Sequence, residues 1–195
     1  MAVTPPSQAS GSDRITVPKL NRDPIQSLAP FPVEVTVAGH DFVIPALPAS
    51  EWLSVLMVED LALDDVFPGL LSEVDTEAVE DVILLGRLDL DEIEDTILAI
   101  IETVSARHWW VTLRLIETAR GSWDVLGAEM GLRGVDPSRI SLSQWLDILL
   151  LVTIRAMDPK EVQMFTMKLE APPPNVEPDE SEMEMSQSAF MAMAN

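Results

Sequence analysis

Cysteine and tyrosine are absent from this sequence, and histidine occurs only twice, as His40 and His108. Without cysteine the chain can form no disulfide framework, no thiolate metal site and no thiol nucleophile. A lone histidine lacks the partner ligands that a metal site needs, so we interpret each as structural or solvent-exposed. These absences remove the ligands and nucleophiles of most metal and covalent chemistry.

Basic residues are also scarce, because 12 lysines and arginines stand against 33 aspartates and glutamates, a net charge of −21. A potential of that sign repels phosphate backbones and anionic membranes, so neither nucleic acid nor a membrane is an expected partner. The strongest apolar run, at residues 146–154, contains Asp147 and is far shorter than the ~20 residues that cross a bilayer. Residues 1–30 show no secretory signal, so the cytoplasm is the expected location.

The common catalytic motifs are missing as well. The sequence has no P-loop, no G-x-G-x-x-G, no H-E-x-x-H and no G-x-S-x-G. Asp89, Asp91 and Asp95 match three positions of a calcium loop, but Glu94 replaces its glycine and Ile100 its final glutamate. Nothing marks a cleft that would separate the pKa values of two carboxylates for acid–base work. The sequence therefore predicts a non-enzymatic protein without a cofactor or metal.

Hydrophobic residues make up 47% of the 195 residues, enough for the core of one domain. Residues 1–30 are rich in proline and lack any hydrophobic period, which predicts a flexible arm. Residues 171–195 hold three consecutive prolines and then five carboxylates without a basic residue, which predicts a disordered acidic tail. The predicted domain covers residues 31–170.

Within that domain the pattern predicts a mainly α, compact helical bundle with a short N-terminal β-hairpin. Val33, Val35 and Val37 alternate with polar residues, and a turn at 38–41 leads into a second strand at 42–44. Helices are expected at 77–88, 91–104 and 108–118. N-caps are expected at Ser50, Thr76, Ser122, Ser141 and Asp158.

Two of these helices have distinct apolar patterns. The helix at 91–104 carries one apolar stripe behind an acidic first turn, as a surface helix with one buried face does. The stripe consists of Ile93, Ile97, Ile100, Ile101 and Val104. Residues 145–154 are apolar on nearly every face, so we place that helix at the centre of the bundle.

The acidic residues are concentrated in one stretch. Residues 51–102 hold 16 acidic residues and one basic residue, a net of 1 − 16 = −15, whereas residues 103–169 hold 7 acidic and 8 basic residues, a net of +1. The plain interpretation is a solvated face that keeps the protein dispersed. The functional interpretation is an acidic belt that faces a basic or very apolar partner.

Aromatic and methionine side chains are the candidates for partner binding. Most of the five tryptophans are expected to be core anchors. Neighbours on a helix point about 100° apart, so we expect one of Trp109 and Trp110 to face a groove or a partner. In the acidic tail, apolar residues among carboxylates fit either an ordinary disordered end or a segment that folds against a partner. The candidate partner-binding residues are Trp109, Trp110, Met183, Met185, Phe190 and Met191.

Several short motifs follow one another in a characteristic order. They are V-T-V-A-G-H-D-F-V-I-P at 35–45, Trp52-Leu53, an acidic middle, Trp109-Trp110, Trp123-Asp124, Gly134-Val135-Asp136-Pro137, Trp145-Leu146-Asp147 and Phe165 before three prolines. This order, over about residues 30–174, resembles the tail assembly chaperones of long-tailed bacteriophages, especially those of actinobacterial hosts.

The resemblance implies a helical, non-enzymatic protein of the host cytoplasm that is absent from the mature virion. Its implied partners are the tape measure protein, whose apolar helices it would keep soluble, the tail tube protein, and a longer frameshifted form of itself. Two alternatives stay open. One is a structural phage adaptor such as a head-to-tail connector component, and the other is a metal-dependent acidic hydrolase.

Overall fold

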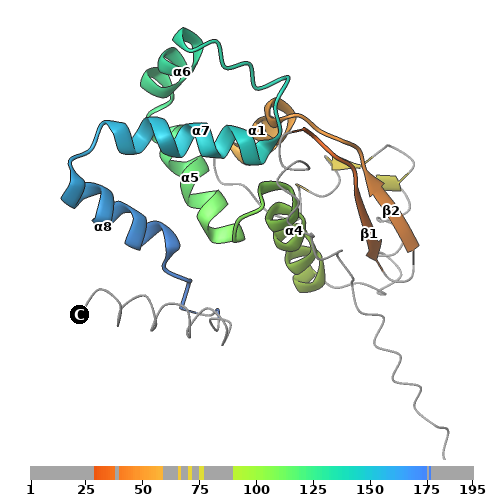
Figure 1. Ribbon diagram of the computed structural model, residues 1–195. Helices are drawn as coiled ribbons and strands as arrows, with labels where there is room; N and C mark the ends of the chain where they lie inside the picture. The colour runs from red at the N-terminus through yellow and green to blue at the C-terminus, as the bar shows by residue number, and fades with distance from the viewer. Residues whose placement is uncertain are drawn as a thin grey trace, which may run out of the picture.

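The computed structural model describes residues 29–37, 40–58, 66, 70–71, 75–76, 90–174 and 176. These residues form a mainly helical fold in which a two-stranded antiparallel hairpin precedes the helices, as Figure 1 shows. The predicted fold class is thereby confirmed. The predicted helix at 77–88 and most of the arm and the tail lie outside the described residues, and the domain limits of 31 and 170 stay a prediction.

The hairpin consists of β1, Val33–Val37, and β2, His40–Ile44. Its paired side chains Val33 with Ile44 and Val35 with Phe42 are buried, which confirms the predicted alternation at Val33 and Val35. The predicted turn at 38–41 was too long, because Val37 pairs with His40 and both His40 and Asp41 belong to β2. The Thr36 hydroxyl donates to the Asp41 carboxylate across the ladder at 2.8 Å, a pairing that the local sequence did not reveal.

Helix α1, Ala49–Leu56, begins against a loop far away in the sequence. The backbone N–H of Ala49 donates to the carbonyl of Ile140 at 2.9 Å, and that of Ser50 donates to the carbonyl of Pro137 at 3.0 Å. The expected N-cap at Ser50 is therefore wrong, since Pro48 holds that position and the distant loop satisfies the first two donors.

Asp136 organises this loop. Its carboxylate accepts hydrogen bonds from the Ser138 hydroxyl at 2.7 Å and the Ser138 backbone N–H at 3.0 Å, and the Arg139 guanidinium lies 3.2 Å away. The hydroxyl bond first, then the backbone bond and the Arg139 charge, hold the pKa of Asp136 below its usual value. The loop that supports α1 is thus fixed by an ionised carboxylate.

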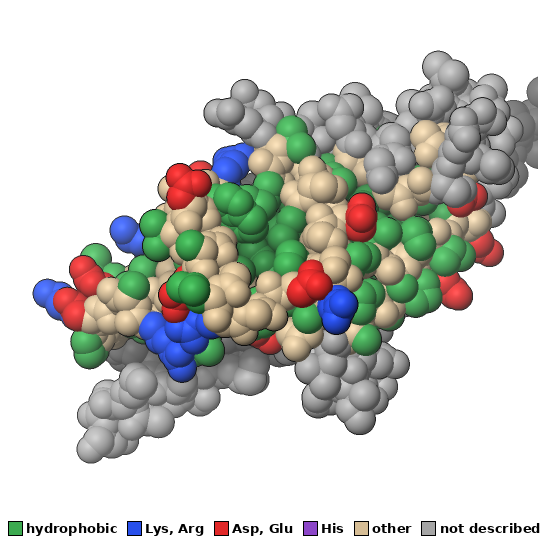
Figure 2. All heavy atoms as spheres, turned by 90° about the horizontal axis from the view of Figure 1, so that it is seen from above, with side chains coloured by type: hydrophobic (Ala, Val, Ile, Leu, Met, Phe, Trp, Pro, Cys, Tyr) green, Lys and Arg blue, Asp and Glu red, His purple; other side chains and the backbone are tan. Residues whose placement is uncertain are grey.

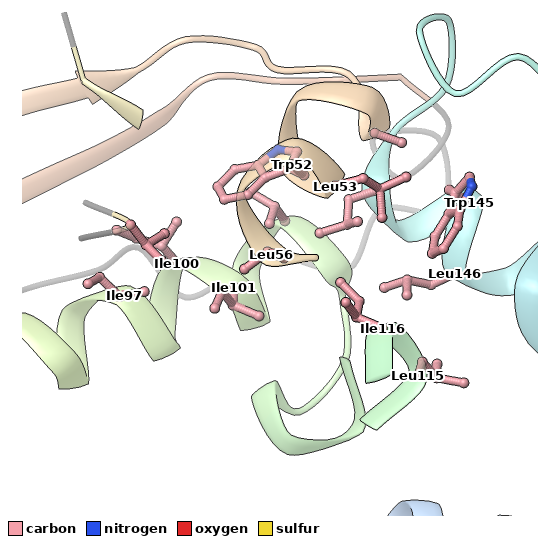
Figure 3. Packing of buried hydrophobic residues seen from close by; sticks show 14 of the residues in the cluster. Trp52, Leu53, Leu56, Ile97, Ile100, Ile101, Leu115, Ile116, Trp145 and Leu146 are labelled. Carbon is pink, nitrogen blue, oxygen red and sulfur yellow. The ribbon is translucent and has the colours of Figure 1, made fainter. Parts of the chain in front are cut away.

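The central helices are α4, Leu90–Ser105, and α5, Trp109–Gly121. All five residues of the predicted stripe on α4 are buried, so the surface helix with one buried face is confirmed. Side chains from α1, α4, α5 and α7 converge in one core, which Figure 3 shows around Trp52, Ile101 and Trp145.

Three further helices complete the fold: α6, Trp123–Leu132; α7, Leu142–Arg155; and α8, Pro159–Glu170. Ser141 caps α7 by accepting from the backbone N–H of Gln144, and Asp158 caps α8 in a capping box with Glu161. Ser122 stands at the N-cap of α6 as predicted, but its side chain accepts no capping hydrogen bond.

Helix α7 is central over only part of its length. Its fully buried residues all lie at or before Leu149, whereas Ile148, Val152 and Ile154 are half-buried and Leu151 is exposed. The prediction that the whole apolar stretch is surrounded was therefore wrong. The reason is that α8 packs against α5, which leaves the second half of α7 at the edge of the bundle.

Candidate interaction surface

Helix α8 is anchored to α5 through its C-terminal end. The Arg114 guanidinium on α5 donates to the carbonyl oxygens of Lys168 at 2.8 Å, Leu169 at 3.0 Å and Ala171 at 2.5 Å. The indole N–H of Trp110 donates to the carbonyl of Glu170 at 3.3 Å. These are the carbonyls that a helix leaves without an internal partner, so α5 supplies the C-cap of α8.

The two faces of α8 differ sharply. Its inward face carries Val162 and Phe165, both half-buried, and Leu169, which is the one fully buried residue of this helix. On the far side, at helical spacing, Met164 is 52% exposed and Met167 is 66% exposed. An apolar face that no described element covers therefore lies on the outside of α8.

Helix α6 also exposes apolar side chains. Leu126 and Met130 are buried, but Val125 and Leu132 are exposed, Leu132 at 85%. Trp123 is 41% exposed, and its ring lies over Gly127 and 6.4 Å from the ring of Trp145, measured between centroids. One face of the Trp123 indole is thus packed while part of it remains accessible.

We call these side chains the exposed apolar set, and they come from three consecutive helices. Its members are Trp123, Val125 and Leu132 on α6, Leu151 on α7, and Met164 and Met167 on α8. Figure 2, which views the molecule from above, shows hydrophobic side chains gathered in a hollow near the middle of that face. Large exposed apolar side chains form an interaction surface where they lie together, so the members of this set are candidates for contacts with a partner.

The predicted partner-binding residues fall in different places. Trp110 is buried and stacks on His108 with ring centroids 4.2 Å apart. Trp109 is half-buried and forms a T-shaped pair with Trp110, with ring centroids 5.6 Å apart. Trp109 is therefore the more accessible of the pair. The predicted tail residues Met183, Met185, Phe190 and Met191 lie outside the described residues.

The sequence reasoning missed the exposed apolar set. Residues 123–132 carry apolar side chains on both sides of the helix, so their pattern did not say which side would be covered. Met164 and Met167 fall outside the inward stripe of Val162, Phe165 and Leu169. Their position outside this stripe was the one signal in the sequence that these two methionines would be exposed.

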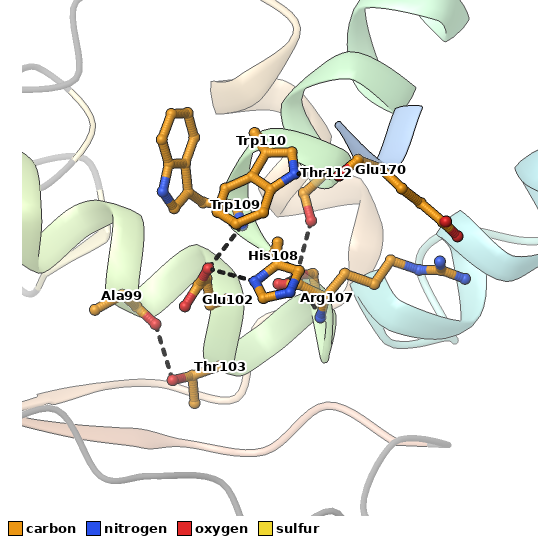
Figure 4. A network of polar contacts seen from close by, with 10 residues as sticks. Ala99, Glu102, Thr103, Arg107, His108, Trp109, Trp110, Thr112 and Glu170 are labelled. Carbon is orange, nitrogen blue, oxygen red and sulfur yellow. Dashed lines mark hydrogen bonds and ion pairs between the residues drawn. The ribbon is translucent and has the colours of Figure 1, made fainter. Parts of the chain in front are cut away.

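The corner between α4 and α5 is held by polar contacts, which Figure 4 shows. The Glu102 carboxylate accepts from the backbone N–H of Trp109 at 3.1 Å and lies 3.4 Å from Nδ1 of His108. The buried Thr112 hydroxyl donates to the Ser105 hydroxyl at 2.8 Å. Because these contacts fix the start of α5, they also fix Trp110 and Arg114, which hold α8.

The described part of the chain was compared with two structural requirements, a group of metal ligands and a membrane-spanning helix. Among those residues no three histidine, aspartate or glutamate side chains are grouped as metal ligands. None of the helices formed by the described residues is both long and apolar enough to traverse a bilayer. Every buried side-chain nitrogen or oxygen within this part has a hydrogen-bond partner.

Comparison with known proteins adds no relative. No protein-family model, no curated protein and no solved structure matches this chain.

Proposed function

We propose that this chain is a non-enzymatic tail assembly chaperone of a long-tailed bacteriophage, which acts in the host cytoplasm and is absent from the mature virion. In this proposal it binds the tape measure protein, keeps it soluble and helps to recruit tail tube subunits. The observation that carries the proposal is the exposed apolar set on α6, α7 and α8 in a chain of net charge −21. The ordered motifs that resemble this family supply the identity of the client.

The exposed apolar set has the chemistry that an apolar helical client requires. Methionine side chains are flexible and polarizable, so Met164 and Met167 can adapt to different client side chains. Trp123 can act as an anchor, since tryptophan is enriched among residues that dominate binding energies. Burial of these side chains against a client helix would remove apolar area from water on both partners.

Most motifs behind the resemblance serve the fold itself. Trp52 and Trp145 are core residues, and the loop that begins at Gly134 supports the start of α1. These motifs therefore specify the scaffold. Client contacts are left to the exposed apolar set and to Trp109.

The acidic residues have a separate role in this proposal. Asp91, Glu94 and Asp95 are exposed in the first two turns of α4. Carboxylates there would repel other copies and steer encounters, but their attraction is screened within ~8 to 10 Å at physiological salt. They should change the rate of association more than the stability of the complex.

The decisive experiment is co-expression with a helical fragment of the tape measure protein from the same phage. The wild-type chain should keep the fragment in the soluble fraction, whereas Trp123→Ala combined with Met164→Ala and Met167→Ala should return it to the pellet. Val43→Ala is the matched control, because Val43 is an exposed apolar residue on the hairpin. Trp109→Ala tests the half-buried tryptophan, and circular dichroism checks that each variant is folded.

Neutralisation of Asp91, Glu94 and Asp95 to Asn or Gln should slow association and flatten its salt dependence while most of the complex persists. If the charge variants abolish binding and the apolar variants do not, an electrostatic clamp replaces this model. Recovery of the chain as a ring component of purified virions would instead favour a structural adaptor.

A further inference from the structure

We propose that the outward face of α8 is a docking site for the acidic, methionine-containing segment 177–195 of the same chain. The partner of this face is thus part of the same polypeptide. Docking of the segment does not depend on the proposed function. Three observations support it: the chemistry of the face, the place where the segment starts, and the distribution of charge.

The face combines apolar and basic side chains. Met164 and Met167 are exposed, and the exposed Lys160 and Lys168 lie on the same side of the helix, each four residues from Met164. Within the described residues neither lysine forms an ion pair. The face therefore offers two apolar contacts between two available cations.

The segment begins beside this helix. The carbonyl of Ala171 is held by Arg114, the N–H of Val176 donates to the carbonyl of Pro173 at 3.0 Å, and Val176 packs half-buried against the core. Residues 177–195 thus start close to the anchored end of α8. An extended segment of 19 residues reaches about 60 Å, and the 12 residues of α8 span about 18 Å, so the segment can run along the whole helix.

Charge favours this location over the rest of the molecule. The segment carries five carboxylates and no basic residue, together with Met183, Met185, Phe190, Met191 and Met193. Residues 51–102 have a net charge of −15 and repel it, whereas residues 103–169 have a net charge of +1. Covalent linkage gives the segment a high effective concentration at α8, so weak contacts suffice for docking.

Docking would cover Met164 and Met167. On the proposed function, the segment would then compete with the client for part of the exposed apolar set and shield it while no client is present. This consequence rests on the proposed function, but the docking can be measured without any client.

The absence of cysteine makes a direct test possible in the full chain. A nitroxide label is attached to Ser188→Cys, and the methyl groups of the methionines are observed by NMR after ¹³C labelling, with assignment by single Met→Leu variants. The label should broaden the signals of Met164 and Met167 and leave those of Met57 and Met130 sharp. Reduction of the nitroxide should restore the broadened signals.

A matched pair of charge reversals tests the role of the lysines. Lys160→Glu with Lys168→Glu should abolish most of the broadening, whereas Arg14→Glu with Lys19→Glu, in the predicted N-terminal arm, changes the net charge equally and should preserve it. Equal broadening of all methionines, or sharp Met164 and Met167 signals in the labelled wild-type chain, would overturn the proposal. Equal responses to the two charge-reversed pairs would overturn it as well. Because no client is present, none of these results depends on the chaperone proposal.

Discussion

The indole N–H of Trp110 donates to the backbone carbonyl of Glu170 at 3.3 Å, and so joins the first turn of α5 to the last turn of α8. Arg114, one helical turn further along α5, donates to three more carbonyls at the same end of α8. The position of α8, and of the methionines on its outer face, therefore depends on two side chains of another helix.

Loss of the Arg114 contacts should loosen α8. In Arg114→Met we expect the unfolding free energy to fall by about 1.5 to 3 kcal/mol, the usual range for hydrogen bonds to a charged group. Hydrogen exchange in the last turn of α8 should accelerate, because its carbonyls lose their cap. Arg120→Met is the control, since among the described residues Arg120 donates to the Val58 carbonyl and not to α8, so exchange in α8 should stay unchanged.

Two tryptophans whose rings lie close together should respond very differently to truncation. Trp145 is 1% exposed, so Trp145→Ala should cost roughly 3 to 5 kcal/mol through the cavity that it leaves. Trp123 is partly exposed, so Trp123→Ala should cost much less. Chemical denaturation of both variants measures the difference, and similar losses would show that Trp123 is a core residue.

A gain in stability is expected at the corner after α4. Ala106 has a φ of 54°, in the left-handed region that disfavours residues with a Cβ. Ala106→Gly should therefore raise the unfolding free energy by about 1 kcal/mol after the entropy of glycine in the unfolded chain is subtracted. Ala156, which has a φ of −85°, is the control, because Ala156→Gly should destabilise the protein.

The loop around Asp136 should make stability depend on pH in the acid range. Because folding lowers the pKa of this carboxyl, its contribution is complete above the unfolded value, near 3.9, and is lost as the pH falls through the folded value. Ser138→Ala removes the largest cause of that lowering. The melting temperatures of wild type and Ser138→Ala should therefore differ at pH 7 and converge at lower pH, and a constant difference would contradict this assignment.

Local patterns predicted much of the fold. The stripe on α4, the alternation in the hairpin, and the caps at Ser141 and Asp158 all depend on residues within a few positions of one another. The predictions that were wrong concern features that depend on distant parts of the chain. The start of α1 is satisfied by loop carbonyls about ninety residues away, and the exposure of Leu151 depends on where α8 packs.

The candidate surface was harder to predict for the same reason. Trp110 and Trp123 are both tryptophans at helix starts, yet one is buried and the other partly exposed. That difference arises from the helices that pack beside them. Periodicity identifies an apolar face, but it cannot say whether another element covers that face.

The dependence of α1 on the carbonyls of Pro137 and Ile140 sets an order for biosynthesis. A ribosome synthesises the hairpin and α1 well before residue 140, so the first donors of the nascent helix bond to water until that loop has been made. Stable closure of the amino-terminal half must wait until the α6–α7 loop has left the exit tunnel. We therefore expect α1 to reach its final position only late in synthesis.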